Sequence, residues 1–329
     1  MNRSLDLSRW KEAPRGVAYR RWTIVSNGLR QLQRLRFFKI LLSVAWSGGL
    51  LIAVAGFGFS QSLATGGWLE GLAQRSGPRA EALFSVLTGL VALFPDIVVH
   101  SLFTLIFWAH SFLGLWLSLI ALATLVPQLI TRDRASNALI VYLARPLTSV
   151  DYLLGKLGVI VGVIALMWTG PLVVGWLLSM LFATDRDFVV YSLSPLLRAL
   201  AFNGIGLVAL AAIALGVSAL GRRPQITTGI WMSLWLIFGV MAAPPRAPDW
   251  MKRTSFTHDL SEVRQEVFRL DSALTEAAAS LPILDQQFTA NLAAAGKKAE
   301  ATDFKGALLA LGAFVGLSSV VFLRRIRPE

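Results

Sequence analysis

The charged side chains best placed to do chemistry outside a membrane lie in one stretch, residues 132–156, between two long apolar runs. Its Gly155-Lys156 pair is a partial match to a phosphate-binding loop. The upstream glycine and the following Ser/Thr are missing, and Gly296-Lys297 lacks them too. The chain also contains neither a His-Glu-x-x-His nor a Gly-x-Ser-x-Gly motif. The sequence therefore predicts no site for hydrolysing ATP in this chain and argues against a membrane hydrolase.

Polar side chains are rare inside the apolar runs, which limits the chemistry that these runs can support. No Asp, Glu, Lys or Arg lies in their cores, although proton- and cation-coupled carriers usually need one. His100 and His110 are the titratable groups there, and their spacing puts them on different faces of a helix. Each is better explained as a packed aromatic than as a proton relay. Together with Asn203, they are the candidate pathway residues.

Six apolar runs are long enough to cross a bilayer, which takes about 20 residues. The chain is 55% hydrophobic and 15% charged, whereas a soluble domain has about 25% charged residues. The runs are continuous rather than alternating, which excludes a β-barrel. The sequence therefore predicts an all-α integral membrane protein with six transmembrane helices. These are 38–60, 97–126, 154–183, 197–220, 226–243 and 306–323.

The distribution of Lys and Arg predicts the orientation of the six spans. With the N-terminus in the cytoplasm, the inner segments hold 19 basic and 5 acidic residues, and the outer segments hold 12 and 14. Both termini are therefore predicted to be cytoplasmic, with anionic lipid head groups as the partner of the basic side. No basic, aromatic-rich folded surface for nucleic acid is present. The absence of cysteine excludes thiolate metal sites, and no metal site is predicted.

This topology divides the chain into four regions. Residues 1–39 form a cytoplasmic N-terminus, and 40–243 contain spans one to five with a charged hinge at 127–156. Residues 244–305 form an extracytoplasmic helical loop. Residues 306–329 hold the sixth span and a basic cytoplasmic tail.

An amphipathic elbow helix is predicted just before the first span, at 22–36. Its apolar side chains recur at spacings of three and four: Trp22, Val25, Leu29 and Leu32. Arg30 and Arg34 share the opposite side. Such a helix lies flat at the cytoplasmic surface. It serves either as a topology anchor or as an elbow that meets a cytoplasmic partner.

Two outer segments carry further helical signals. Leu83–Phe94 is apolar but too short to span, so it is predicted to be interfacial or re-entrant, either shielding the bundle or lining a pathway. In 244–305, apolar residues at alternating spacings of three and four predict a helix with a heptad seam, followed by a second helix from Leu284 to Leu292. The seam residues are Leu260, Val263, Val267, Leu270, Leu274, Ala277 and Leu281. Either this hairpin (256–292) packs on its own span ends, or it meets a second copy or an extracytoplasmic protein.

The hinge itself reads as two helices joined by a turn. Residues 128–144 are predicted to form one helix that stops at Arg145-Pro146, because the residue before proline avoids helical torsions. The next helix begins after this turn and runs into the third span. There Gly170-Pro171 is expected to kink it.

The amino-acid sequence of the hinge resembles that of the ABC type-2 permease family. In that family an acidic residue precedes a Leu-rich helix, an Arg-Pro pair and a Leu-Gly-Lys opening of the next helix. Here the matching residues are Asp133, Asn137–Ala144, Arg145-Pro146 and Leu154-Gly155-Lys156. The architectural resemblance covers nearly the whole chain and the motif about 25 residues. Many members have Glu and then Gly-Thr where this chain has Asp133 and Ser136-Asn137.

The resemblance implies a half-transporter of a bacterial-type cytoplasmic membrane. Two permease copies, or two related permeases, would assemble with two cytoplasmic ABC ATPase subunits that bind ATP and Mg, while this chain holds no cofactor and is not itself an enzyme. The hinge would be the coupling helix of an ATP-driven exporter. The alternative is a non-transporting scaffold that recruits partners through its extracytoplasmic hairpin. The implied coupling residues are Arg132, Asp133, Arg134, Asn137, Arg145, Pro146, Asp151, Gly155 and Lys156.

Overall fold

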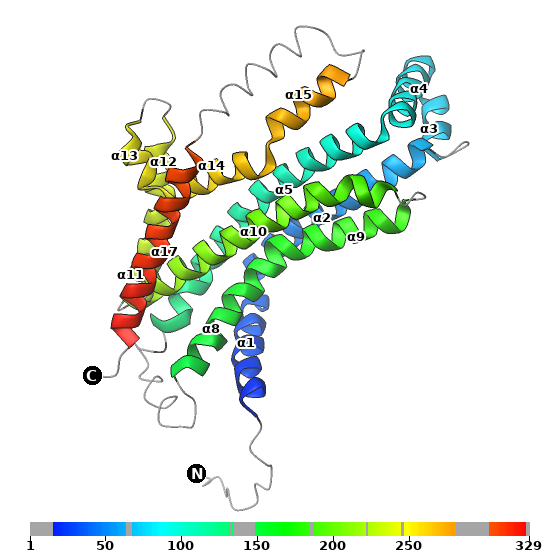
Figure 1. Cartoon of the computed structure of the whole chain (residues 1–329). Helices are drawn as coiled ribbons and strands as arrows, with labels where there is room; N and C mark the ends of the chain where they lie inside the picture. Colours follow the sequence, from blue (N-terminus) through cyan, green and yellow to red (C-terminus); the bar gives the residue numbers. More distant parts are fainter. Residues whose placement is uncertain are drawn as a thin grey trace, which may run out of the picture.

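The computed structural model describes residues 16–63, 68–131, 133, 149–183, 187–221, 223–244, 247–280 and 303–326. Within these residues all the regular secondary structure is helical, as predicted (Figure 1). Six helical segments are long and apolar enough to cross a membrane. They are Arg36–Ser62, Pro95–Thr131, Val150–Phe182, Asp187–Leu220, Pro224–Ala242 and Phe304–Arg325.

The described helices fall into two groups, before and after the hinge. Those before the hinge are α1 (Val17–Gln33), α2 (Arg36–Leu63), α3 (Trp68–Ser76), α4 (Pro78–Leu93), α5 (Pro95–Val126) and the π-helical turn η2 (Pro127–Thr131). Those after it are α8 (Ser149–Ile164), η3 (Ala165–Thr169), α9 (Gly170–Phe182), α10 (Asp187–Leu220), α11 (Pro224–Met232), η4 (Ser233–Ile237), α12 (Phe238–Ala242), α13 (Asp249–Arg253), α14 (Phe256–Phe268), α15 (Leu270–Ser280) and α17 (Phe304–Ile326).

The first and third spans run side by side and in the same direction, α1 along α8 and α2 along α9 (Figure 1). The α2–α9 contact is close because it is made through glycines: a Cβ on Gly49 would lie 2.5 Å from the carbonyl oxygen of Pro171. Ser179 of α9 also donates a hydrogen bond of 2.8 Å to the carbonyl of Ile52. Small residues at such a seam let two backbones approach closely.

The long helices α5 and α10 form the centre of the bundle, and α10 also packs along α17. Both helices carry deeply buried side chains, with Phe103, Phe107 and Phe202 fully inaccessible. The second span continues through η2 to Thr131, five residues beyond its predicted end at 126. Hydropathy located this span but did not predict that regular helical structure continues through η2.

Three spans contain a π-helical turn, η2, η3 and η4. The turn η3 lies directly before Gly170-Pro171, where a kink was predicted, and the chain changes direction between α8 and α9 (Figure 1). A single π-turn inserts an extra residue into the helical ladder and often marks a functional position.

The outer segments differ from the sequence prediction in two ways. The helix α4 covers the predicted apolar piece Leu83–Phe94 but begins earlier, at Pro78, and packs against α3 and α2. The heptad seam was predicted as one helix, and this is wrong. It breaks at Arg269, which adopts a left-handed conformation (φ 48°), so α14 and α15 are separate helices.

The apolar residues of the α14 half of the seam pack inside the chain. Leu260 and Val263 are fully buried, and α14 packs against α10 and α17. The α15 half lies along α5, where Ser101 donates a hydrogen bond of 3.3 Å to the carbonyl of Ala273. The predicted second helix, Leu284–Leu292, lies outside the described residues.

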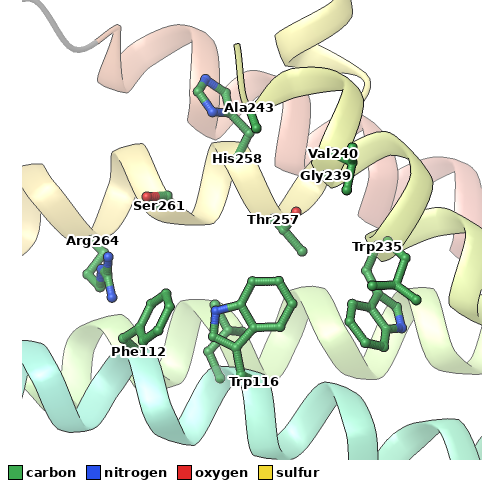
Figure 2. Close-up of a pocket in the computed structure, with 12 residues that line it drawn as sticks. Phe112, Trp116, Trp235, Gly239, Val240, Ala243, Thr257, His258, Ser261 and Arg264 are labelled. Carbon is green, nitrogen blue, oxygen red and sulfur yellow. The ribbon is translucent and has the colours of Figure 1, made fainter. Parts of the chain in front are cut away.

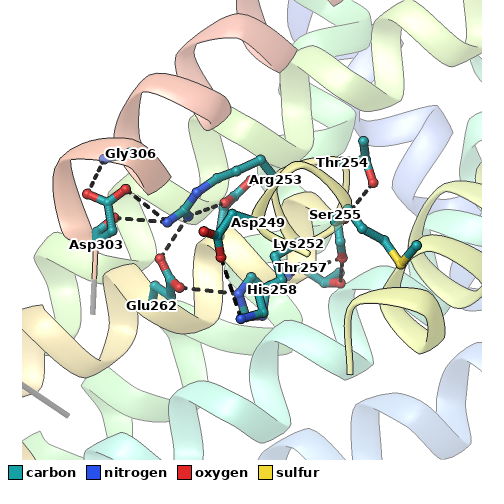
Figure 3. Close-up of polar contacts among 12 residues, drawn as sticks. Asp249, Lys252, Arg253, Thr254, Ser255, Thr257, His258, Glu262, Asp303 and Gly306 are labelled. Carbon is teal, nitrogen blue, oxygen red and sulfur yellow. Dashed lines mark hydrogen bonds and ion pairs between the residues drawn. The ribbon is translucent and has the colours of Figure 1, made fainter. Parts of the chain in front are cut away.

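A polar cluster fastens α13 and α14 to the start of α17 (Figure 3). Arg253 pairs with Asp259 at 2.8 Å, Glu262 at 2.7 Å and Asp303 at 3.2 Å. Asp303 in turn accepts a hydrogen bond of 3.0 Å from the backbone N–H of Gly306, which caps α17. One guanidinium thus joins three helices.

Candidate functional site at the hinge

The structure describes four of the nine predicted coupling residues: Asp133, Asp151, Gly155 and Lys156. The predicted helix 128–144 is described only to Thr131 and at Asp133. The other predicted coupling residues lie outside the described residues: Arg132, Arg134, Asn137, Arg145 and Pro146.

Asp133 and Lys156 form an ion pair across the hinge, with 2.7 Å between Oδ2 and Nζ. Both side chains are largely buried, at 17% and 15% exposure. The same carboxylate oxygen accepts a hydrogen bond of 2.6 Å from the hydroxyl of Tyr152, and Lys156 also lies over the Tyr152 ring. A partly buried pair that is also hydrogen-bonded holds its geometry better than an exposed one. The two sides of the hinge are therefore locked together.

Asp151 fixes the start of α8 to the elbow helix α1. The guanidinium of Arg21 donates to one carboxylate oxygen of Asp151 from Nε at 2.8 Å and from Nη2 at 2.5 Å. Asp151 lies in the first turn of α8. Arg21 could not be singled out from the sequence pattern, because it and Asp151 lie 130 residues apart in the chain.

Beyond this ion pair, toward α9, α1 packs on a row of glycines of α8. Gly155, Gly158 and Gly162 face the elbow residues Ile24, Val25 and Leu29, each close enough that a Cβ would collide. The elbow therefore packs lengthwise on the third span, a contact that its amphipathic pattern alone did not predict. Gly155 leaves the space that the side chain of Ile24 occupies. The predicted elbow residues are exposed: Trp22 and Arg30 on α1, and Arg34 just beyond its end.

A second polar cluster joins the end of the second span to the fourth and fifth. Ser218 of α10 accepts a hydrogen bond of 2.9 Å from the backbone N–H of Ile130 in η2. Thr131 donates to the Ser218 carbonyl at 2.9 Å, and its hydroxyl lies 3.0 Å from that of Thr227 in α11. These side chains supply the partners that a π-turn needs for its displaced backbone groups.

Tyr152 connects the two clusters, because its hydroxyl contacts both Asp133 and, at 3.3 Å, the carbonyl of Leu129 in η2. The ring is buried, with 3% of its surface exposed. The base of the hinge is therefore one bonded unit of α1, η2, α8, α10 and α11.

Two of the three predicted pathway residues meet at η3 inside the bundle. His110 contacts the carbonyl of Trp168 at 3.1 Å through Nε2, and the Asn203 amide reaches the Thr169 hydroxyl at 3.5 Å. The ring of Trp168 fills the space between Gly114 and Gly206. This cluster is packed and buried, which fits the structural role expected for His110. His100 lies elsewhere, against the backbone of Tyr191.

The described residues contain no group of His, Asp or Glu that could hold a metal ion. Comparison with known proteins adds no identification, since no protein-family model matches the chain and no curated protein is significantly similar to it.

Proposed function

We propose that this chain is the membrane-spanning permease subunit of an ATP-driven exporter. Its hinge receives the motion of a separate cytoplasmic ATPase and passes it to the transmembrane helices. The chain contributes the pathway and the coupling element, while the partner binds ATP and Mg. Two copies, or this chain and a related permease, form the complete transporter in a bacterial-type cytoplasmic membrane, with both termini in the cytoplasm.

The bonded unit at the base of the hinge is the observation that supports this proposal most directly. A coupling element has to be stiff, because a flexible hinge would absorb the motion of the ATPase. Ion pairs from Asp133 and Asp151 hold the hinge to α8 and α1, and Ser218 holds η2 to α10. Partly buried charged contacts of this kind keep a single geometry.

The second candidate function, a scaffold that recruits partners through the 244–305 loop, has less support. A recruiting seam would present its apolar residues outward. Leu260 and Val263 are instead buried inside the chain. The exposed Trp250 of α13 is the feature that favours a partner on this side.

Co-purification with the cytoplasmic ATPase subunit, followed by ATP turnover in proteoliposomes, tests the proposal. The double variant Arg145→Glu, Asp133→Lys reverses charge at two hinge positions. It is expected to lose ATPase binding and permease-stimulated turnover. Arg79→Glu, an exposed charge reversal on α4, controls for a change of surface charge and should retain both. Unchanged ATPase binding in the hinge variant would show that the hinge is not the docking element.

A further inference from the structure

A separate cavity lies between α5, α14 and the η4–α12 part of the fifth span, away from the hinge. It has a volume of about 320 Å³ and is lined largely by apolar and aromatic side chains. Figure 2 shows α14 on one side and α5 on the other, with Arg264 and Phe112 toward one end and Trp235 toward the opposite end. Binding sites for small molecules start at about this size and combine an apolar lining with a few polar groups.

Arg264 lines this cavity, and two of its guanidinium nitrogens have no hydrogen-bond partner among the described residues. It is buried, with 7% of its surface exposed, and its Nε and Nη1 have no hydrogen-bond partner among the described residues. No ion pair to Arg264 is found in that part of the chain either. Burial lowers the pKa of Arg264 to about 10, so the guanidinium stays charged at neutral pH. An uncompensated buried charge is costly, and such a residue is usually paired or bound to something.

Two aromatic rings of α5 fix the position of this guanidinium. Its central carbon lies 4.5 Å from the ring centre of Trp108 and 5.0 Å from that of Phe112. Cation–π contacts of this kind orient an arginine, but they leave the N–H groups at its edge without acceptors. The edge donors of a guanidinium match the two oxygens of a carboxylate or the oxygens of a phosphate.

Apolar side chains that line the cavity also reach the outer surface of the chain. Phe112 and Val240 are 49% and 70% exposed. Trp116 and Trp235 add two more aromatic surfaces to the lining. Their rings make an edge-to-face contact with an angle of 67° between the ring planes. An opening framed by exposed apolar side chains of a membrane span favours entry from the lipid phase over entry from water.

We infer that this cavity is a binding site for an acidic amphiphile, an oxyanion carried on a single apolar chain. The oxyanion binds the edge of Arg264, and the chain lies along Trp116 toward Trp235. This site is independent of the proposed coupling at the hinge, since it shares no residue with it. It accounts for a buried arginine that the described residues do not neutralise.

The test uses the full chain in lipid nanodiscs and the fatty acid 12-bromododecanoate, whose bromine quenches nearby tryptophans. We expect saturable quenching that drops when Trp116 and Trp235 are both changed to Phe. Arg264→Met is expected to weaken binding by about 10- to 100-fold, the effect of losing a charged hydrogen-bond donor. Its fold should remain intact, because replacing an unpaired buried charge by an apolar side chain is neutral or stabilising.

Two further probes separate the contribution of the anionic group from that of the ligand's alkyl chain. Bromododecanol carries the chain without the anion, and acetate carries the anion without the chain; competition by each should be at least tenfold weaker than that of dodecanoate. Inorganic phosphate in place of acetate tests a free anion as the occupant. The inference is overturned if Arg264→Met binds bromododecanoate as tightly as the unmodified chain. It is also overturned if bromododecanol binds equally well, or if phosphate alone competes as strongly as dodecanoate.

Discussion

Replacing Gly158 by alanine tests whether the elbow helix is seated on the third span. A Cβ at this position would lie 2.6 Å from Cγ2 of Val25, whereas two carbon atoms pack best at about 3.5–4.0 Å. The overlap is therefore about 1 Å. Val25 cannot rotate away at low cost, because a β-branched side chain in a helix has one strongly preferred rotamer. The helix α1 must shift, or the contact must strain.

The expected magnitude follows from two opposing effects. Overpacking a close contact costs about 1–3 kcal/mol. Alanine also favours a helix over glycine by about 1 kcal/mol. Gly204→Ala on α10 isolates the second effect, because nothing lies within 4 Å of its Cβ position. The two variants should therefore differ by about 1–3 kcal/mol in the free energy of unfolding, with Gly158→Ala the less stable.

The assay is unfolding of the purified chain in mixed micelles, followed by circular dichroism as the denaturing detergent is increased. Val25→Ala should restore the Gly158→Ala variant, because it removes the methyl groups that overlap, and a double-mutant cycle should give a coupling of about 1–3 kcal/mol. Equal stability of the Gly158→Ala and Gly204→Ala variants would refute the described packing of α1 on α8. Failure of Val25→Ala to rescue would refute it as well.

Three further predictions concern the polar contacts. Asp133→Lys and Lys156→Asp should each destabilise the chain by about 1–3 kcal/mol, and the two together should recover most of it because the ion pair is rebuilt in reverse; unfolding of the four proteins measures this. Burial raises the pKa of Asp259 from 3.8 to about 6. Between these two pH values the folded chain binds a proton at Asp259 that the unfolded chain has lost. The free energy of unfolding should therefore fall as pH rises from about 4 to about 6. Asp259→Asn should remove this part of the pH dependence in unfolding measured across that range; an unchanged slope would contradict it. Ser218→Ala should cost about 1–3 kcal/mol, because the N–H of Ile130 loses its acceptor, while exposed Ser319→Ala should be neutral in the same measurement.

The six spans could be predicted from the sequence because each needs only a local signal, about 20 consecutive apolar residues. Their ends could not. The segment Pro95–Thr131 has 37 residues, longer than the bilayer core requires, and its last turn contains polar Gln128 and Thr131. That turn stays helical because Ser218, 88 residues away from Ile130, bonds its backbone. A contact with such a distant partner leaves no mark in the local pattern.

The break between α14 and α15 shows the same limit. Arg269 adopts a left-handed conformation although neither glycine nor proline marks the position. Arg198 of α10 donates a hydrogen bond of 3.0 Å to the carbonyl of Phe268, the last residue of α14. This carbonyl, which has no partner within its own helix, is thus bonded by a side chain of another helix. At the hinge, the charged residues were recognised from sequence, but Arg21 and Tyr152 were not. Both act through contacts with residues far away in the chain, which spacing cannot predict.

The parallel packing of the first span on the third has a consequence for biogenesis. The glycine-containing face of α2 receives its partner α9 only after more than 100 further residues have been made, since α2 ends at Leu63 and α9 begins at Gly170. At about 5–20 residues per second this takes about 5–20 s. During this interval the first span has inserted without its neighbour, and the close backbone contact at Gly49 is open to lipid or to another protein. The small-residue face of α2 is therefore completed only when the third span arrives.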